Sequence, residues 1–269
     1  MEMQKSEGGI MNQYLQEQFG LTGKRALVTG AGRGLGRAIA EALGFAGAEV
    51  CVHYNKSESA AKEVVSVIEK SGAKAWTIGA DLTDSAAVHA MFEKIAGRWN
   101  GAFDILVNNT GDLVQRAKIE EFPDDLLERV LRVNIHSAVY TSRSAIPMLR
   151  KGKDPIIINL SSVAAHHGGA NGATIYAATK GAIHTYTRGL AKELAPQIRV
   201  NAIAPGVALT DFHRTHSTPD GLAGIANNTP LKRLGAPEDH GAAAVFLCGK
   251  GGSFITGEVI EINGGLWLA

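Results

Sequence analysis

The sequence has few cysteines, no excess of either charge and no long apolar run. Cys51 and Cys248 are its 2 cysteines, too few for a disulfide framework or a thiolate metal site, so we expect both to be buried free thiols. Lys and Arg number 27 against 26 Asp and Glu, without the basic excess of dedicated nucleic-acid binders. No apolar run approaches the ~18 residues of a membrane span, and residues 1–20 lack the hydrophobic core of a signal peptide. We therefore expect a cytoplasmic protein without a nucleic-acid or membrane partner.

What the sequence does contain is an alternation of strand and helix patterns. Apolar residues make up 45% of the 269 residues, enough to bury a sizeable core. From Lys24 onward, short buried strands alternate with helical patterns, which predicts a parallel sheet covered by helices. The seven predicted strands are 26–28, 50–52, 75–78, 105–107, 156–158, 200–204 and 259–262, and the two longest predicted helices are 126–149 and 174–194.

The chain shows no repeat, low-complexity tract or interdomain linker. We therefore predict one α/β domain over residues 21–269, since a single core can reach ~250 to 300 residues. It is preceded by an extension, residues 1–20, which we expect to be flexible. Residues 207–234 contain Pro, Gly and Asn without sustained periodicity, which is typical of a mobile lid.

A glycine-rich turn follows the first predicted strand and opens the first helix. Gly30, Gly34 and Gly36 permit a tight turn, let the backbone approach a pyrophosphate and let the helix pack closely on the strand. The helix N-terminus, with Arg33 and Leu35, then presents N–H groups to phosphates. An ordinary strand-to-helix turn has the same composition, but the position after the first of seven strands favours a dinucleotide site.

The end of the second predicted strand bears on the choice of cofactor. A carboxylate there binds the ribose 2′-OH of NAD, whereas it would repel the 2′-phosphate of NADP. The segment from Val52 to Ser57 contains no acid, and Arg33 together with Tyr54, Asn55, Lys56 and Ser57 predicts a preference for NADP(H). The alternative is that these are solvated loop residues. Asp81 and Leu82, after the third strand, are placed to contact adenine, although Asp81 also fits a helix cap.

Tyr176 and Lys180 are four residues apart near the start of a predicted helix, so they share one face. An ammonium beside a phenol stabilises the phenolate and lowers its pKa from ~10. Such a tyrosine gives a proton to a carbonyl that receives a hydride. This spacing is common by chance, but here it follows Ser161 and Ser162 at the carboxyl end of the fifth strand, where open α/β sheets place ligands.

Together the motifs resemble those of the short-chain dehydrogenase/reductase family over Leu21 to Trp267. The matching segments are Thr29 to Gly36, Asn108-Asn109-Thr110-Gly111, Asn134, Ser162, Tyr176 with Lys180, Ala204-Pro205-Gly206 with Thr210, residues 234–239, and Phe254 to Gly257. The resemblance implies a single-domain Rossmann fold with a doubly wound seven-stranded parallel sheet and helices on both faces. It also implies a homotetramer.

The same resemblance assigns roles to individual residues. It implies that Tyr176 is the general acid or base, that Lys180 lowers its pKa and holds the nicotinamide ribose, and that Ser162 binds the substrate oxygen. Asn134 would hold a water that links Lys180 to solvent. The residues implied to line the cofactor are Asn108, Thr110 and Gly111, and those near the nicotinamide are Pro205, Gly206 and Thr210.

Three departures from the family pattern stand out. Thr110 replaces the usual alanine and adds a hydroxyl beside the cofactor wall. Ser162 lies 14 residues before Tyr176, one more than is common, so we expect a bulge between them and keep Ser161 as an alternative. Asn263-Gly264-Gly265 replaces the usual acidic ending, which we expect to affect subunit contacts.

The substrate and the rival functions stay open at this point. The family members most resembled are 3-oxoacyl-acyl carrier protein reductases and sugar dehydrogenases. We expect a polar substrate, either a 3-oxoacyl thioester, with acyl carrier protein as a partner, or a keto-sugar or sugar acid. The polar residues expected at the mouth are Gln115, Arg116, Lys118, His166, His167, Asn171, His213 and Arg214, and those facing a carrier are Arg129, Arg132 and Lys192.

Two further alternatives are a metal site and a silent protein. Asp211, His213 and His216 have ligand-like spacing, but the reaction needs no metal and we predict no metal site. A catalytically silent cofactor-binding sensor or scaffold is the alternative from another class. The presence of Asn134, Ser162, Tyr176 and Lys180 together favours the enzyme.

Overall fold

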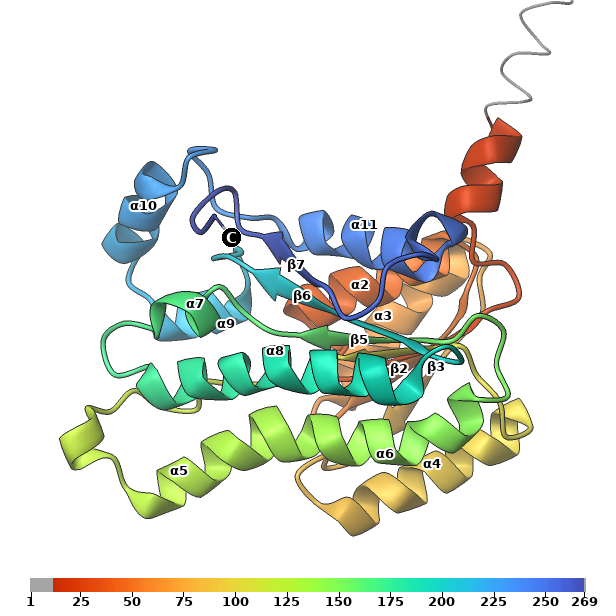
Figure 1. Cartoon of the computed structure of the whole chain (residues 1–269), viewed down its shortest axis with the longest axis horizontal. Coiled ribbons are helices and arrows are strands. Elements are labelled where there is room, and N and C mark those ends of the chain that lie inside the picture. The colour runs from red at the N-terminus through yellow and green to blue at the C-terminus, as the bar shows by residue number, and fades with distance from the viewer. Residues whose placement is uncertain (1–11, 269) are drawn as a thin grey trace, which may run out of the picture.

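A seven-stranded parallel sheet forms the centre of the molecule (Figure 1). The structure is a computed structural model that describes residues 12–268, apart from the side chain of His213. The strand order is β3-β2-β1-β4-β5-β6-β7, with strands β1 (Arg25–Val28), β2 (Glu49–Tyr54), β3 (Ala75–Gly79), β4 (Ile105–Asn108), β5 (Ile156–Leu160), β6 (Arg199–Pro205) and β7 (Val259–Ile262). The order reverses direction between β1 and β4, so the predicted doubly wound Rossmann fold is confirmed.

Helices cover both faces of the sheet because each strand buries side chains on both sides. In β1, Ala26 and Val28 pack into one core cluster and Leu27 into the other. The first cluster includes α2 (Gly34–Phe45), α3 (Glu58–Lys70) and α11 (Pro237–Cys248). The second includes α4 (Ser85–Trp99), α6 (Ser137–Leu149) and α8 (Thr174–Leu194). Cys51 and Cys248 are buried free thiols, as predicted.

The predicted helix over 126–149 is interrupted. It consists of α5 (Asp124–Leu131), one π-helical turn, η2 (Arg132–His136), and α6. The side chain of Asn134 donates a hydrogen bond to the Val130 carbonyl at 2.9 Å within this turn. A π turn inserts one residue without breaking the apolar pattern, so hydrophobic periodicity does not reveal it. Its effect is to present Asn134 to the end of β4.

Short helices gather where the strands end. The arrowheads of β6 and β7 point toward the end of the molecule at which α7 (Ala164–His167), α9 (Asp211–His216) and α10 (Pro219–Asn228) lie (Figure 1). The segment predicted to be an irregular lid is thus largely helical. Thr218 caps α10 by accepting a hydrogen bond from the Gly221 N–H, and Pro219 occupies its first turn. Two one-turn 3₁₀ helices lie at Ile119–Glu121 and Lys250–Gly252.

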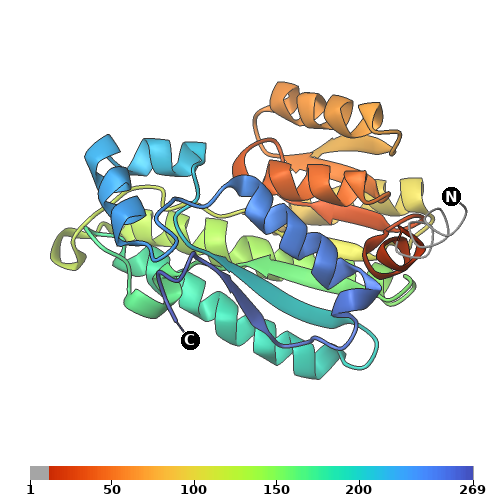
Figure 2. The same ribbon diagram turned by 90° about the horizontal axis from the view of Figure 1, so that it is seen from above.

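At the opposite end, residues 12–19 are helical, where we expect a flexible extension (Figure 2). Phe19 packs on Phe246 of α11 with 6.3 Å between the ring centroids. The rest of the extension, residues 1–11, lies outside the described residues. Within residues 12–268, none of the helices has the length and apolarity needed to cross a membrane.

Candidate active site

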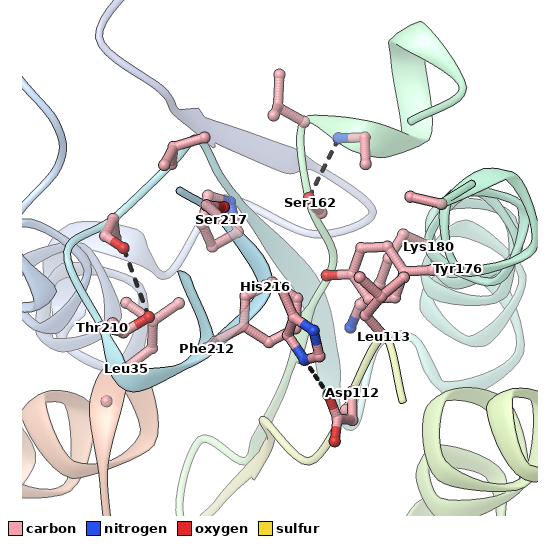
Figure 3. A pocket seen from close by; sticks show the side chains of 18 of the residues that line it. Leu35, Asp112, Leu113, Ser162, Tyr176, Lys180, Thr210, Phe212, His216 and Ser217 are labelled. Carbon is pink, nitrogen blue, oxygen red and sulfur yellow. Dashed lines mark hydrogen bonds and ion pairs between the residues drawn. The ribbon is translucent and has the colours of Figure 1, made fainter. Parts of the chain in front are cut away.

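A cavity of about 900 Å³ lies at the carboxyl ends of the strands. The glycine turn after β1 lines one part of it, the segment after β5 and the start of α8 line another, and α9 and α10 contribute side chains to its wall. Tyr176 and Lys180 lie inside it, with Ser162 and Asp112 beside them (Figure 3). This is the position that open α/β sheets use for ligands.

Ser162, and not Ser161, faces the phenol of Tyr176. The Ser162 hydroxyl hydrogen-bonds Tyr176 and accepts from the Ala164 N–H at 3.1 Å. Ser161 is buried, and its hydroxyl donates to the backbone carbonyl of Lys180 at 2.9 Å. The extra residue before Tyr176 is accommodated by α7 and by a turn that includes Gly168, with φ at +79°.

Burial dominates the electrostatics of Tyr176 and Lys180. Burial is the main cause that raises the pKa of Tyr176 to about 12; the Ser162 hydrogen bond lowers it and the Asp112 carboxylate raises it, each by less than burial does. Burial also lowers the pKa of Lys180 to about 8. The Lys180 Nζ donates to the Leu160 carbonyl at 2.8 Å and lies 5.7 Å from the centre of the Tyr176 ring. The pKa of Tyr176 thus moves opposite to our expectation, because desolvation penalises the buried phenolate.

Gly111 lets two polar side chains approach the end of β4. A Cβ at Gly111 would lie 2.7 Å from the Asn134 Oδ1 and 2.9 Å from the Lys180 Nζ, so a larger residue would displace these side chains. Asn134 exchanges two hydrogen bonds with the backbone of Asp112, accepting from its N–H at 3.1 Å and donating to its carbonyl at 2.7 Å. The π turn, Gly111 and Lys180 therefore form one connected unit.

The glycine turn has the shape of a phosphate cradle. Gly30 and Gly34 have φ of +59° and +56°, in the region that favours glycine. A Cβ at Gly36 would lie 2.5 Å from the Gly30 carbonyl oxygen, so this position also requires glycine. The Thr110 hydroxyl is buried and has no hydrogen-bond partner among the described residues, and it lies beside Gly30. An open backbone cradle with an unused hydroxyl fits a dinucleotide.

His53, in the neighbouring strand β2, supports this turn and was missed by sequence reasoning. It is buried in β2, its Nδ1 accepts from the Gly30 N–H at 3.0 Å, and its Nε2 donates to the Ala80 carbonyl at 3.1 Å. Burial lowers its pKa to about 4, so the ring is neutral and can fill both roles. The sequence feature that could have identified His53 is that it is the single polar side chain between the apolar residues Val50 to Val52 and Tyr54.

The comparisons with known proteins agree with this geometry. The family model described as enoyl-(acyl carrier protein) reductase matches residues 30–267. The hydroxynaphthalene reductase-like protein Arp2 of Metarhizium robertsii is 38% identical over 258 residues, which cover 91% of this chain and 95% of that protein. The chain belongs to the short-chain dehydrogenase/reductase family. It is therefore an oxidoreductase.

Solved structures of the family superpose on nearly the whole chain. The complex of RhlG from Pseudomonas aeruginosa with NADP has a TM-score of 0.86 and 34% identity, covering 94% of this chain and 99% of that one. A 7α-hydroxysteroid dehydrogenase complexed with NADH and 7-oxo glycochenodeoxycholic acid has a TM-score of 0.87 and 33% identity, covering 93% and 96%. These two family members were solved with different cofactors.

Several residues that the sequence suggests for cofactor binding lie away from the cavity of this short-chain dehydrogenase/reductase. Asn108 is buried behind it and hydrogen-bonds Thr141, Ser142 and Asn159. Asp81 accepts from both the N–H and the hydroxyl of Thr83, while Asp84 caps α4. The residues found in the lining are Gly30, Arg33, Gly34, Leu35, Gly36, Thr110, Gly111, Pro205, Gly206 and Thr210, and those outside it are Tyr54, Asn55, Lys56, Ser57, Asp81, Leu82 and Asn108.

Arg116 links two segments that border the cavity. Its guanidinium donates to the His216 carbonyl in α9 at 3.1 Å and to the Ala170 carbonyl at 2.7 Å, and so bridges the lid and the loop before α8. The His216 ring lies 3.3 Å from an Asp112 carboxylate oxygen (Figure 3). Of the residues expected at the mouth, Arg116, His167 and Asn171 line the cavity, whereas Gln115, Lys118, His166 and Arg214 do not, and the His213 side chain lies outside the described residues.

His53 gives the fold a dependence on pH that can be measured. Its folded pKa, about 4, lies below the ordinary 6.5, so the stability from the neutral ring is full above pH 6.5 and is lost as the pH falls toward 4. Between pH 7 and pH 5, protonation of this group alone lowers the free energy of unfolding by about 2 kcal/mol. We expect the free energy of unfolding of His53→Gln, measured in urea, to fall by that much less than the wild-type value over the same pH range. His89→Gln, at an exposed position, should keep the wild-type slope; equal slopes for the wild type and His53→Gln would contradict the assignment.

Proposed function

We propose that this chain interconverts a carbonyl and a secondary alcohol with NADP(H), using Tyr176 as the general acid and base. The observation that carries the proposal is that Ser162 hydrogen-bonds the Tyr176 phenol while the Lys180 Nζ lies 5.7 Å from the centre of the same ring, in a cavity that continues to the glycine turn. The homotetramer implied by the family resemblance is part of the proposal.

Each residue has a separate task in the reaction. The glycine turn and the Thr110 hydroxyl would hold a reduced nicotinamide cofactor, which when bound would supply the hydride. Ser162 donates a hydrogen bond to the substrate carbonyl oxygen, and Tyr176 gives that oxygen its proton. The Lys180 ammonium stabilises the phenolate left behind, while Asn134 holds a water that returns protons from solvent.

The raised pKa of Tyr176 suits the reducing direction at neutral pH. With a pKa of about 12 the phenol is protonated at pH 7 and ready to donate. Oxidation of an alcohol needs the phenolate, whose population rises with pH. Bound substrate and cofactor change the surroundings of both groups, so the pKa that governs turnover belongs to the complex.

Replacement of Tyr176 by phenylalanine tests the proton donor. Tyr176→Phe keeps the ring but removes the proton, and we expect kcat to fall by ~10² to 10⁴. Cofactor binding, measured by quenching of protein fluorescence, should persist. Tyr186→Phe is the matched control because Tyr186 lies on the same helix with its hydroxyl bonded to Ser142, outside the cavity.

The two serines supply a second control for the same assignment. Ser162→Ala should lower kcat far more than Ser161→Ala, since only Ser162 faces Tyr176. Full turnover by Tyr176→Phe would refute the assignment of Tyr176 as the proton donor. A wild-type protein that binds cofactor but reduces no carbonyl across a broad panel would favour the silent sensor or scaffold.

The preference for NADP(H) rests on the residues around the adenosine end. Arg33 is exposed, precedes α2 and lines the cavity, and the exposed residues after β2 include Lys56 and no acid before Glu58. Because family structures contain either NADP or NADH, these residues of the chain itself carry the argument.

Arg33→Ala tests the cofactor preference. Loss of a charged hydrogen bond costs ~1.5 to 3 kcal/mol, so we expect kcat/KM for NADPH to fall about ten- to a hundredfold while that for NADH changes little. Arg37→Ala is the control, since Arg37 pairs with Glu41 at 2.8 Å on the same helix. Equal efficiency with both cofactors in the wild type would contradict the proposal.

The charges of the cavity favour a 3-oxoacyl thioester over a sugar acid. Arg33, Arg116 and Lys180 are the arginines and lysines among its described lining residues. Arg33 lies at the cofactor end, and Arg116 and Lys180 donate to backbone carbonyls. Arg214 pairs with Asp211 outside the lining. An anionic sugar acid therefore meets no unengaged cation in the described wall, whereas the reacting part of a thioester is uncharged.

The rest of the wall also suits an acyl chain. Leu113, Phe212 and Ile225 supply apolar surface, and Ser217 and Thr218 supply hydroxyl groups near the mouth. The surface suggested for an acidic carrier is partly neutralised, because Arg129 lies 3.9 Å from Asp125 and Arg132 lies 3.7 Å from Glu128. Lys192 is exposed. We therefore propose that the acyl thioester contributes more to recognition than acyl carrier protein.

A set of substrates separates these possibilities. We expect kcat/KM for a 3-oxoacyl N-acetylcysteamine thioester to exceed that for a keto-sugar acid by at least about tenfold, the factor that 1.4 kcal/mol represents. Arg116→Ala should raise KM for both by loosening the lid, whereas Arg129→Ala should affect only the carrier-linked thioester. Preference for the sugar acid, or for an uncharged polycyclic ketone, would contradict the substrate proposal and leave the Tyr176 assignment intact.

A further inference from the structure

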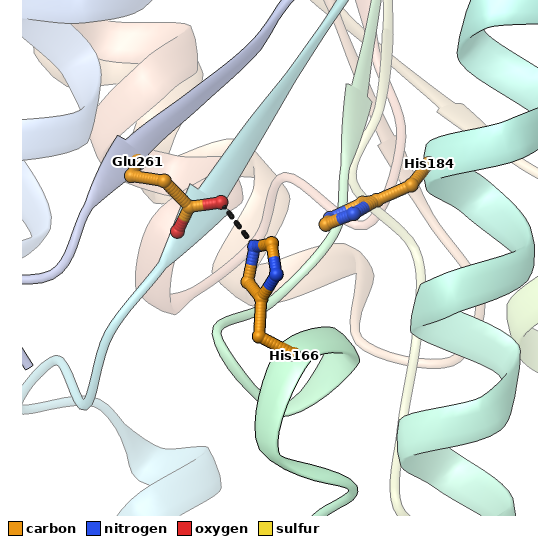
Figure 4. Close-up of side chains that lie close together, drawn as sticks. All are labelled: His166, His184 and Glu261. Carbon is orange, nitrogen blue, oxygen red and sulfur yellow. Dashed lines mark hydrogen bonds and ion pairs between the residues drawn. The ribbon is translucent and has the colours of Figure 1, made fainter. Parts of the chain in front are cut away.

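Behind the cavity, two histidines and a glutamate converge from three elements. His166 lies in α7, His184 in α8 and Glu261 in β7 (Figure 4). The His166 Nε2 is 2.7 Å from the Glu261 Oε1, and one ligand atom from each of the three residues lies within 4.8 Å of the other two. His184 stands two turns after Tyr176 and one turn after Lys180 on the same helix, yet neither His166 nor His184 nor Glu261 belongs to the lining of the active-site cavity.

The His184 ring is the unusual member of this cluster. Only 7% of the residue is exposed, and its Nε2 has no hydrogen-bond partner among the described residues. Buried polar atoms are almost always partnered, so an unpartnered nitrogen indicates a missing partner. A metal ion is one such partner, because a neutral imidazole nitrogen is the commonest metal ligand in proteins.

The surroundings hold the other two ligands in place. The Asn263 side chain donates to the Glu261 Oε2 at 3.1 Å, which leaves Oε1 directed at His166. The Trp267 ring stacks on His166, with 5.1 Å between centroids and 10° between planes. Hydrogen bonds to the outer atoms of ligands are typical of metal sites, where they fix ligand orientation.

The cluster is also accessible. Glu261, Asn263 and Trp267 line a second cavity of about 720 Å³. The His166 and Glu261 side chains are 23% and 16% exposed, so an ion and its water can reach them while His184 closes the inner side.

We propose that His166, His184 and Glu261 bind a divalent transition-metal ion, with Zn²⁺ as the ion that this ligand set suits best. Two imidazoles and one carboxylate with a water in the fourth position make a known type of zinc coordination. The ion takes the place of the proton between His166 and Glu261. Ligand atoms about 2.0–2.1 Å from the ion are roughly 3.3 Å from one another in a tetrahedron. The His166–Glu261 pair must open slightly and His184 must approach, both by side-chain rotation.

Such an ion would support the active site without taking part in the reaction. It joins α7, which begins two residues after Ser162, to α8, which carries Tyr176 and Lys180, and to β7. The proposed site is not the candidate that residue spacing suggested, Asp211, His213 and His216. In that group, Asp211 pairs with Arg214 and His216 pairs with Asp112.

Metal binding is tested on the untagged full chain after chelation and removal of the chelator. Equilibrium dialysis against Zn²⁺ and elemental analysis give the stoichiometry, and Co²⁺ gives the visible absorption of a tetrahedral site. We expect one ion per chain in the wild type, with the affinity lowered at least about 100-fold in His184→Asn and in Glu261→Gln. Zn²⁺ at 100 times its Kd should raise the Tm of the wild type by about 5–10 °C.

His89→Gln is the matched control. His89 and Glu93 form an exposed pair at 3.5 Å, so this variant removes a histidine with a carboxylate neighbour at another position and should bind Zn²⁺ as the wild type does. Far-ultraviolet circular dichroism of each variant without metal establishes folding. Absence of stoichiometric Zn²⁺ in the wild type would overturn the proposal, as would unchanged binding in folded His184→Asn and Glu261→Gln. Neither result bears on turnover by Tyr176.

Discussion

The double attachment of Lys180 to the end of β5 is the interaction on which the site depends. The Lys180 side chain donates to the Leu160 carbonyl, and the Lys180 carbonyl accepts from the Ser161 hydroxyl. These bonds join the residue one turn after Tyr176 to the two residues before Ser162. The relative position of phenol and hydroxyl is thereby set by the sheet and not by the loop between them. An extra residue in that loop can fold into α7 without separating Ser162 from Tyr176.

Burial then sets the protonation states. The same desolvation raises the pKa of the Tyr176 phenol and lowers that of the Lys180 ammonium, so each group is pushed toward its neutral form. In the reaction proposed above, the phenol keeps its proton until it donates it to the substrate, and the Lys180 ammonium then stabilises the phenolate. The sequence motif suggested that Lys180 stabilises the phenolate. It did not reveal that burial raises the pKa of Tyr176, because the motif carries no information on how far the site excludes water.

The periphery shows a second consequence of the fold. Because all strands end at one edge of a parallel sheet, segments far apart in the sequence meet there: Arg116 reaches the carbonyls of His216 and Ala170, and Glu261 reaches His166. The first contact links α9 to the loop before α8 beside the cavity. The second contact, together with His184, forms the proposed metal site. From residue spacing alone we predicted no metal site.

The sequence by itself determined the seven strands, their alternation with helices, and the places of Tyr176, Lys180 and the glycine turn. These follow from local patterns: apolar periodicity, a four-residue spacing on one helix, and glycines at a strand end. Tertiary structure decided what depends on distant partners. Asn134 faces inward because of a π turn that leaves the apolar periodicity intact. Asn108 lies behind the cavity, and His53 hydrogen-bonds Gly30. The tertiary structure also brought Glu261 and His166, 95 residues apart, to 2.7 Å. No local pattern encodes such contacts, because they arise only when strands from the whole chain end at the same edge of one sheet.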